Sequence, residues 1–221
     1  AMGDVWYGGT TKNPWNLEQG SSGSSAGSGS STAAGLVPFA LGTETLGSIV
    51  SPSTRNGVTG LRPTFGRVSR AGAMALSWTM DKIGPMTRSA LDCALVLDAI
   101  RGEDNKDLTV QNHPFNYTGK ADLSKLKIGY LKDYFDGGRG SQKINDSISL
   151  EVLKSLGATL EPVEWVSDMP FGAMQAILTA EASAAFDALT RSDQDTLLVR
   201  QNAGAWPNLF RAARFTSAVD Y

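Results

Sequence analysis

The chain has 221 residues, of which 41% are hydrophobic and 19% charged, enough for a soluble globular protein with a real core. Its formal charge of −2 with no clustered basic face argues against nucleic-acid binding, and no apolar stretch approaches the roughly 20 residues that span a bilayer. One Cys, one His and no visible signal peptide argue against a disulfide framework or a multi-Cys metal site, and favour a cytoplasmic protein with no cofactor.

The first third of the chain is rich in turns and small residues. Residues 3–20 are predicted to form turns, residues 26–35 a close-packed helix, and residues 36–41 a short buried strand. Pro and Gly punctuate residues 51–72, which are therefore predicted to be turns with at most short strands.

A clear helix signal follows between Thr87 and Gly102. Thr87 or Ser89 can cap this helix, and Asp92 lies three residues after Ser89, as in a capping box. Apolar residues continue the pattern until Gly102, which is expected to end the helix.

The second half predicts a strand–helix–strand unit over residues 125–165. A strand is expected at 127–131, and a second at 158–163. Between them, apolar residues recur every four positions and predict a helix stopped by Gly157; they are Ile144, Ile148, Val152 and Leu156. Such a βαβ-like unit indicates a layered α/β fold. Further helices are predicted at 170–189 and 210–221.

Residues 20–54 carry the chemistry-bearing pattern, a Gly/Ser run followed by a second small-residue turn. Candidate serines Ser24 and Ser48 lie in these two places, separated by 24 residues. The run could be a flexible linker, but it passes straight into a buried-looking segment. It could cradle phosphate, but it lacks the Lys-Ser/Thr ending of a P-loop.

The run also contains a GxSxG match, which would make Ser25 a nucleophile with His113 as its base. A nucleophile elbow of that kind needs an apolar strand directly before it, and the preceding residues cannot form one. His113 is the only histidine and lies in a polar context, so we expect it to be a plain loop residue.

Four segments together resemble the amidase signature family, and the match runs without gaps over residues 13–94, with weaker likeness to Val163. These segments are GSSAGS at 23–28, AAGLVPFALGTETLGSI at 33–49, GVTGLRPTFGRVSRAG at 57–72 and IGPMTRSALDCA at 83–94. The resemblance implies a layered α/β/α fold with a mixed central sheet. It makes residues 1–221 part of a single domain, with residues 13–94 as its core.

The resemblance also implies a Ser-Ser-Lys triad. Ser48 corresponds to the nucleophile, and Ser24 to the bridging serine whose preceding peptide bond is cis. The backbone N–H groups of Thr45, Leu46 and Gly47, together with that of Ser48, would form the oxyanion hole. A neutral lysine would take a proton from the bridging serine while that serine takes one from the nucleophile.

The family's lysine lies upstream of this chain's first residue. None of the three lysines that we considered, Lys12, Lys82 and Lys120, matches its position, and all are expected at the surface. We therefore expect a fragment truncated at both ends and inactive by itself. An alternative is a natural homologue that lacks the base.

Three residues depart from the family pattern near the nucleophile. Leu46 replaces a glycine, which demands an allowed φ and would narrow the pocket. Val50 replaces an arginine and so removes a charge, and Glu44 replaces an aspartate.

The implied activity is hydrolysis of a small carboxylic amide to acid and amine through an acyl-serine intermediate. Within the family, the alternative is the glutamine-hydrolysing subunit of a tRNA-dependent amidotransferase, which works with a partner that holds the tRNA. Outside it, the alternative is a catalytically incomplete binding or scaffold protein. The expected partners are the amide substrate and either a second copy or the remainder of the chain.

Overall fold

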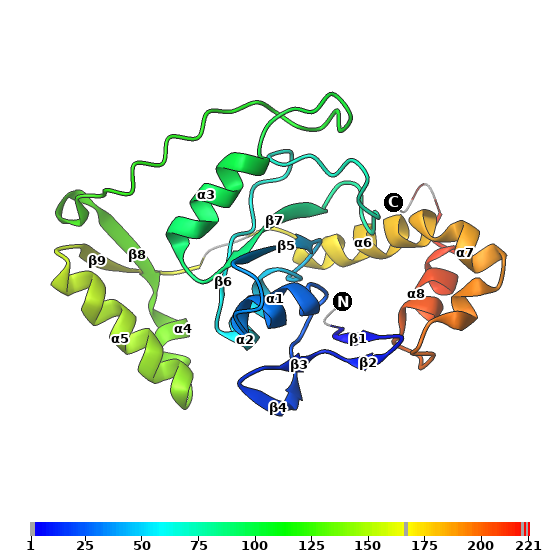
Figure 1. The fold of residues 1–221 in the computed structure, drawn as a ribbon, viewed down its shortest axis with the longest axis horizontal. Helices are drawn as coiled ribbons and strands as arrows, with labels where there is room; N and C mark the ends of the chain where they lie inside the picture. The colour runs from blue at the N-terminus through cyan, green and yellow to red at the C-terminus, as the bar shows by residue number, and fades with distance from the viewer. Residues whose placement is uncertain (1–2, 166–167, 218, 220) are drawn as a thin grey trace. The chain divides into compact units, whose positions relative to one another are not determined.

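The computed structural model describes residues 3–165, 168–217, 219 and 221 (Figure 1). They form two compact units. The larger unit comprises Ala1–Asn116 and Phe171–Tyr221, and the smaller unit comprises Tyr117–Pro170. The assignment of the whole chain to one domain, with its core at 13–94, stays a prediction.

A three-stranded antiparallel sheet lies at the centre of the larger unit. Its strands are β5 (Phe39–Glu44), β7 (Lys82–Thr87) and β6 (Thr59–Gly60), in the order β5-β7-β6. The register places Glu44 opposite Lys82, at the end of β5 from which the candidate nucleophile turn departs.

Helices α1 (Ala26–Ala33) and α3 (Ala90–Ile100) cover opposite faces of this sheet. Successive residues of a strand point to opposite faces. The side chain of Met86 packs against Gly29 of α1, whereas the hydroxyl of the next residue, Thr87, hydrogen-bonds to Cys93 Sγ of α3 at 3.1 Å. The larger unit thus has three layers, helix, sheet and helix, which confirms the predicted α/β class.

Two of the predicted elements in this region are wrong in position or type. The strand expected at 36–41 occupies Phe39–Glu44 instead. Helix α2 (Val50–Asn56) stands where turns were predicted, because Pro52 lies in its first turn, where a missing N–H costs nothing. Strand β7 was not predicted, since a Gly-Pro pair is unusual within a strand.

Helix α3 confirms the capping prediction. The Asp92 N–H donates to Ser89 Oγ at 3.1 Å, and the backbone has left the helix at Arg101, just before Gly102.

The rest of the larger unit consists of short hairpins and a helical group. The turns predicted at 3–20 contain four short strands, namely β1 (Val5–Trp6), β2 (Gly9–Thr10), β3 (Lys12–Asn13) and β4 (Asn16–Gly20).

The helix predicted at 170–189 is divided into α6 (Phe171–Ala185) and α7 (Asp187–Arg191). A 3-10 turn, η2 (Gln194–Leu197), follows. The helix predicted at 210–221 is instead α8 (Trp206–Ala213), and residues 218 and 220 lie outside the described residues. Helices α6, α7 and α8 pack together (Figure 1).

The smaller unit confirms the predicted strand–helix–strand order. Strands β8 (Lys127–Leu131) and β9 (Thr159–Val163) pair in parallel, joined through α5 (Ser141–Ser155). The 3-10 turn η1 (Leu123–Lys125) and the short helix α4 (Lys132–Gly137) were not predicted. The four apolar residues that predicted α5 are exposed, and the helix instead turns Leu150 and Leu153 toward β8. No helix in the described parts of the chain is long and apolar enough to cross a membrane.

Candidate active site

The turn over residues 45–49, which connects β5 to α2, is held from within by the carboxylate of Glu44. This side chain is fully buried, and its Oε2 accepts the N–H groups of Ile49 at 2.7 Å and Val50 at 2.9 Å. Its Oε1 accepts a bond from Arg62 at 3.0 Å. A single carboxylate therefore caps α2 and closes the turn, as an acceptor at a helix N-terminus can.

The pKa of Glu44 reflects this environment. Burial raises the pKa, but the hydrogen bonds from Val50, Ile49, Arg62 and the N–H of Gly47 outweigh it, so that the pKa lies below its usual value. The carboxylate is therefore ionised at neutral pH.

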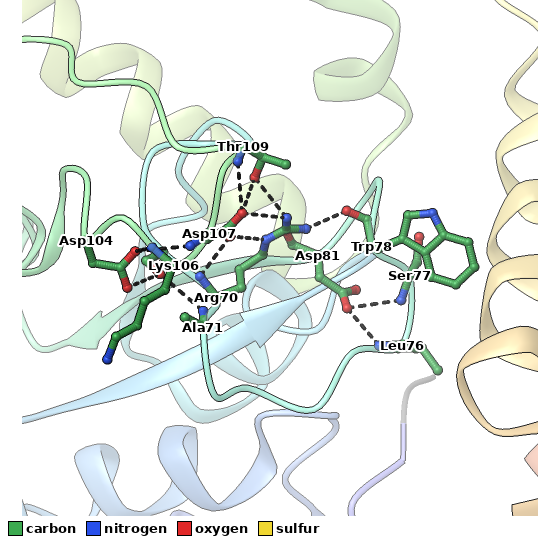
Figure 2. A network of polar contacts seen from close by, with 11 residues as sticks. Arg70, Ala71, Leu76, Ser77, Trp78, Asp81, Asp104, Lys106, Asp107 and Thr109 are labelled. Carbon is green, nitrogen blue, oxygen red and sulfur yellow. Dashed lines mark hydrogen bonds and ion pairs between the residues drawn. The ribbon is translucent and has the colours of Figure 1, made fainter. Parts of the chain in front are cut away.

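Two neighbouring residues at the start of β7 form hydrogen bonds with Thr45, the first residue of the 45–49 turn. Its hydroxyl donates to Asp81 Oδ1 at 2.5 Å, and its carbonyl accepts from Lys82 Nζ at 3.1 Å. Asp81 Oδ2 in turn accepts the N–H groups of Leu76 at 2.8 Å and Ser77 at 3.0 Å (Figure 2). We call these contacts the Asp81–Lys82 clamp; they follow from the register that places Lys82 opposite Glu44.

The structure brings the segments of the two candidate serines together. Ser48 is 4% exposed, and its carbonyl accepts the N–H of Ser25 at 3.2 Å. Ser24, the neighbouring residue, is exposed, and its peptide bond with Gly23 is cis, as expected.

The replacement of glycine by Leu46 is accommodated without strain. The left-handed conformation in the turn falls on Gly47, with φ of 94°, and Leu46 is not among the described non-glycine residues with positive φ. Leu46 is 44% exposed and lines a second cavity of about 620 Å³. The expectation that Leu46 narrows the substrate pocket stays a prediction.

The alternative pair, Ser25 and His113, is not brought together. Ser25 Oγ donates to the carbonyl of Thr43 and accepts the N–H of the same residue, both at 3.0 Å, so it ties α1 to β5. The ring of His113 is exposed and bonds to Gln111 at 2.9 Å. Ser25 thus has a structural role, and His113 lies in a loop as predicted.

A cavity of about 680 Å³ opens beside this region, and we call it the Ser24 cavity. Its wall contains Ser24, Thr45, Asp81 and Lys82, with apolar residues from several segments. Lys82 was predicted to be at the surface; it is half-buried instead, because β7 carries it along the sheet. Burial and the charge of Arg62 lower its pKa, against the opposing effect of Glu44 and Asp81. Lys12 and Lys120 are exposed, as predicted.

Arg70 forms a polar network along the same cavity (Figure 2). Its guanidinium donates to Asp107 Oδ2 at 2.8 Å, to the Trp78 carbonyl at 2.5 Å and to Thr109 Oγ1 at 2.9 Å. The Arg70 guanidinium is the main reason that the pKa of Asp107 is strongly lowered.

The sequence predicted no role in the site for Arg70, Asp81 or Lys82. Arg70 lies within one of the quoted motifs, and Asp81 and Lys82 directly precede another. The register of β5 and β7 brings Lys82 near Thr45, whereas Arg70 meets its carboxylate partner in a loop that is distant in the sequence.

The described residues contain no group of three or more His, Cys, Asp and Glu side chains that could hold a metal ion. Cys93 is buried, and burial raises the pKa of its thiol, so it is a core residue.

Comparisons with known proteins point to one family. The model of the Amidase family matches residues 3–217. A glutamyl-tRNA(Gln) amidotransferase subunit of Lysinibacillus sphaericus is 47% identical over 160 residues, which cover 70% of this chain and 32% of that protein. The native peptide amidase of Stenotrophomonas maltophilia has a similar structure, with a TM-score of 0.81 at 32% identity, over 98% of this chain and 49% of that chain.

A second solved structure gives the same result. The corresponding glutamyl-tRNA(Gln) amidotransferase subunit of Thermotoga maritima matches with a TM-score of 0.69 at 30% identity, over 84% of this chain and 43% of that chain. The chain spans about a third of the length of the curated relatives it matches.

Proposed function

The chain belongs to the Amidase family, and we propose that it carries the nucleophile of an amide hydrolase that converts a carboxylic amide to acid and amine. This proposal rests on one observation, namely that hydrogen bonds fix the conformation of the turn that contains Ser48. Glu44 fixes one end of the turn, the Asp81–Lys82 clamp fixes the other, and the Ser24 segment is bonded to the carbonyl of Ser48. A nucleophile held in this way loses little freedom when it attacks.

In the proposed reaction, Ser24 takes the proton of Ser48 while a neutral lysine takes the proton of Ser24. The oxygen of Ser48 bonds to the amide carbon, and collapse of the tetrahedral intermediate expels the amine, to which Ser24 returns a proton. Water, activated by the same relay, then cleaves the acyl-serine ester and releases the acid.

The oxyanion would be held by backbone N–H groups of the 45–49 turn. Glu44 already accepts the N–H groups of Ile49 and Val50. A hydrogen bond from the Gly47 N–H also lowers the pKa of Glu44. The N–H groups of Thr45, Leu46 and Ser48 are the proposed donors. That of Gly47 would serve only if it were shared between Glu44 and the oxyanion. Loss of one such donor typically costs about 10²- to 10³-fold in rate.

We assign the base to a lysine of the complete protein outside residues 1–221. Lys82 lines the Ser24 cavity, but its ammonium donates to the Thr45 carbonyl, which suits a positioning role. On this account, residues 1–221 alone are inactive.

A second candidate function is glutamine hydrolysis within an amidotransferase. It is favoured by the 47% identity to the glutamyl-tRNA(Gln) amidotransferase subunit of Lysinibacillus sphaericus, whose name makes it part of an assembly. A non-catalytic scaffold is the remaining alternative, and it differs in predicting that Ser48→Ala changes nothing. The cytoplasmic location and the homodimer stay predictions.

The test is a hydrolysis assay on the complete protein that contains residues 1–221. Ammonia release from a series of small carboxamides should fall by at least about 10³-fold in Ser48→Ala and strongly in Ser24→Ala. Ser149→Ala, an exposed serine on α5, is the matched control and should leave the rate unchanged. Full activity in Ser48→Ala would overturn the proposal, and activity on glutamine alone would favour the second candidate.

A further inference from the structure

The wall of the Ser24 cavity is mostly apolar, and several of its side chains are uncovered. Met74 is 83% exposed and Leu108 is 92% exposed, both in loops that border the cavity. Uncovered apolar side chains gathered around one cavity are typical of a ligand site, because burying them against a ligand is favourable.

Three aromatic rings form another part of this wall. The rings of Phe186 and Phe210 stack with centroids 4.8 Å apart and planes 9° apart, and Trp206 lies 5.5 Å from Phe210. All three residues line the cavity. Phe210 is itself buried, so Phe186 and Trp206, which are half-buried, present the apolar surface of this stack at little cost in side-chain entropy.

The helical group that carries these rings is fixed in place. Ser183 Oγ donates to the Phe210 carbonyl at 2.8 Å, which ties α6 to α8. Glu181 of α6 is buried and accepts from Thr79 Oγ1 at 2.7 Å and from Ser77 Oγ, so α6 is tied to the loop that carries Trp78. The aromatic wall and the 77–79 loop therefore form a preorganised surface.

Most charged groups of the cavity already have protein partners. Arg70 is paired with Asp107, and Asp81 accepts two N–H groups (Figure 2). Asp81 also accepts from the Thr45 hydroxyl, and Lys82 donates to the Thr45 carbonyl. Lys106 also lines the cavity but is exposed, so water screens its charge.

These partners decide what kind of ligand the cavity can hold. Glutamine is zwitterionic and would bring an ammonium that needs an anionic partner in the wall. Both carboxylates of the wall, Asp81 and Asp107, are committed to other groups. A buried charge without a partner is strongly unfavourable, whereas an apolar group gains from burial against the exposed side chains.

We propose that the Ser24 cavity binds the acyl group of an uncharged carboxamide that carries an aryl or alkyl side chain. This inference rests on the proposed function, since it places the scissile amide beside Ser24 and the 45–49 turn. The volume of about 680 Å³ accommodates an aryl-substituted acyl chain that reaches the aromatic wall.

The test measures binding separately from hydrolysis. Calorimetry on Ser48→Ala in the complete protein would compare 4-phenylbutanamide, acetamide and glutamine. We expect 4-phenylbutanamide to bind at least tenfold more tightly than either of the others. Equal binding of all three, or tighter binding of glutamine, would overturn the inference.

Two variants locate the site. Trp206→Ala and Met74→Lys should each weaken 4-phenylbutanamide binding about tenfold or more. Met74 is so exposed that its replacement leaves the fold intact, and Leu36→Lys, at a residue that is exposed but outside the cavity, is the matched control. Unchanged binding in Met74→Lys and Trp206→Ala would overturn the inference. Selective binding in a wild-type protein that hydrolyses no carboxamide would support the cavity assignment and remove only the proposed function.

Discussion

Lys82 is a residue whose role depends on a single contact, from its ammonium to the carbonyl of Thr45 at 3.1 Å. Together with Asp81 it fixes the first residue of the turn that carries Ser48. In this account the two residues line the cavity, hold the backbone donors in place and take no part in the chemical steps, so they are positioning residues.

Replacement of Lys82 by Met should therefore lower kcat with little change in KM. The Thr45 carbonyl loses its donor and the turn loosens, and misplacement of about 1 Å typically costs about 10²-fold in rate. Lys82→Arg, which keeps a donor, should restore part of the rate. Steady-state kinetics with Lys120→Met as the exposed control would check this, and a rise in KM at constant kcat would contradict it.

Glu44 has a second, thermodynamic role because its buried carboxylate accepts several N–H groups. We expect Glu44→Gln to lower the free energy of unfolding by about 2 kcal/mol at pH 7, the order of a hydrogen bond to a charged group. The pKa of Glu44 is lower in the folded state than in the unfolded state, so its contribution is fully present above the unfolded value of 4.5.

This stabilisation is lost as pH falls through the folded pKa. Denaturant unfolding of wild type and Glu44→Gln between pH 7 and pH 3 should show the difference between them narrowing on acidification. A difference that stays constant over this range would show that the charge of Glu44 contributes nothing.

At the scale of elements, local signals were sufficient for some helices and strands and insufficient for others. Helix α3 was predictable because its cap and apolar pattern lie within its own sequence. Helix α2 was not, since Glu44, which lies outside the helix, accepts the N–H groups at its start. Strand β7 was hidden by Pro85, whose ring is tolerated where the strand needs no donor.

The cap of α3 gives a direct test at this scale. Ser89→Ala removes the acceptor of the Asp92 N–H and should lower the free energy of unfolding by about 1 kcal/mol. Chemical denaturation would measure this change, with Ser147→Ala, an exposed serine within α5, as the control. An unchanged midpoint in Ser89→Ala would mean that the cap does not stabilise the larger unit.

For the whole molecule, sequence reasoning reached the family and proposed the two serines, but it did not reach the surroundings of the proposed site. Ser24 and Ser48 lie in a motif that can be read linearly. The Asp81–Lys82 clamp depends on how β5 and β7 pair, and the aromatic wall depends on how α7 and α8 pack. Both arrangements join residues that are far apart in the sequence, so no local sequence pattern predicts them. Lys82 was therefore misplaced at the surface, and the wall of Phe186, Trp206 and Phe210 was not anticipated.

The central claim is that Ser48 is the nucleophile. The most direct measurement is peptide mapping by mass spectrometry after the complete protein reacts with a fluorophosphonate probe. The account predicts one adduct, on Ser48, which is absent in Ser48→Ala and much slower to form in Ser24→Ala. An adduct on Ser24 or Ser25, or one that persists in Ser48→Ala, would contradict it.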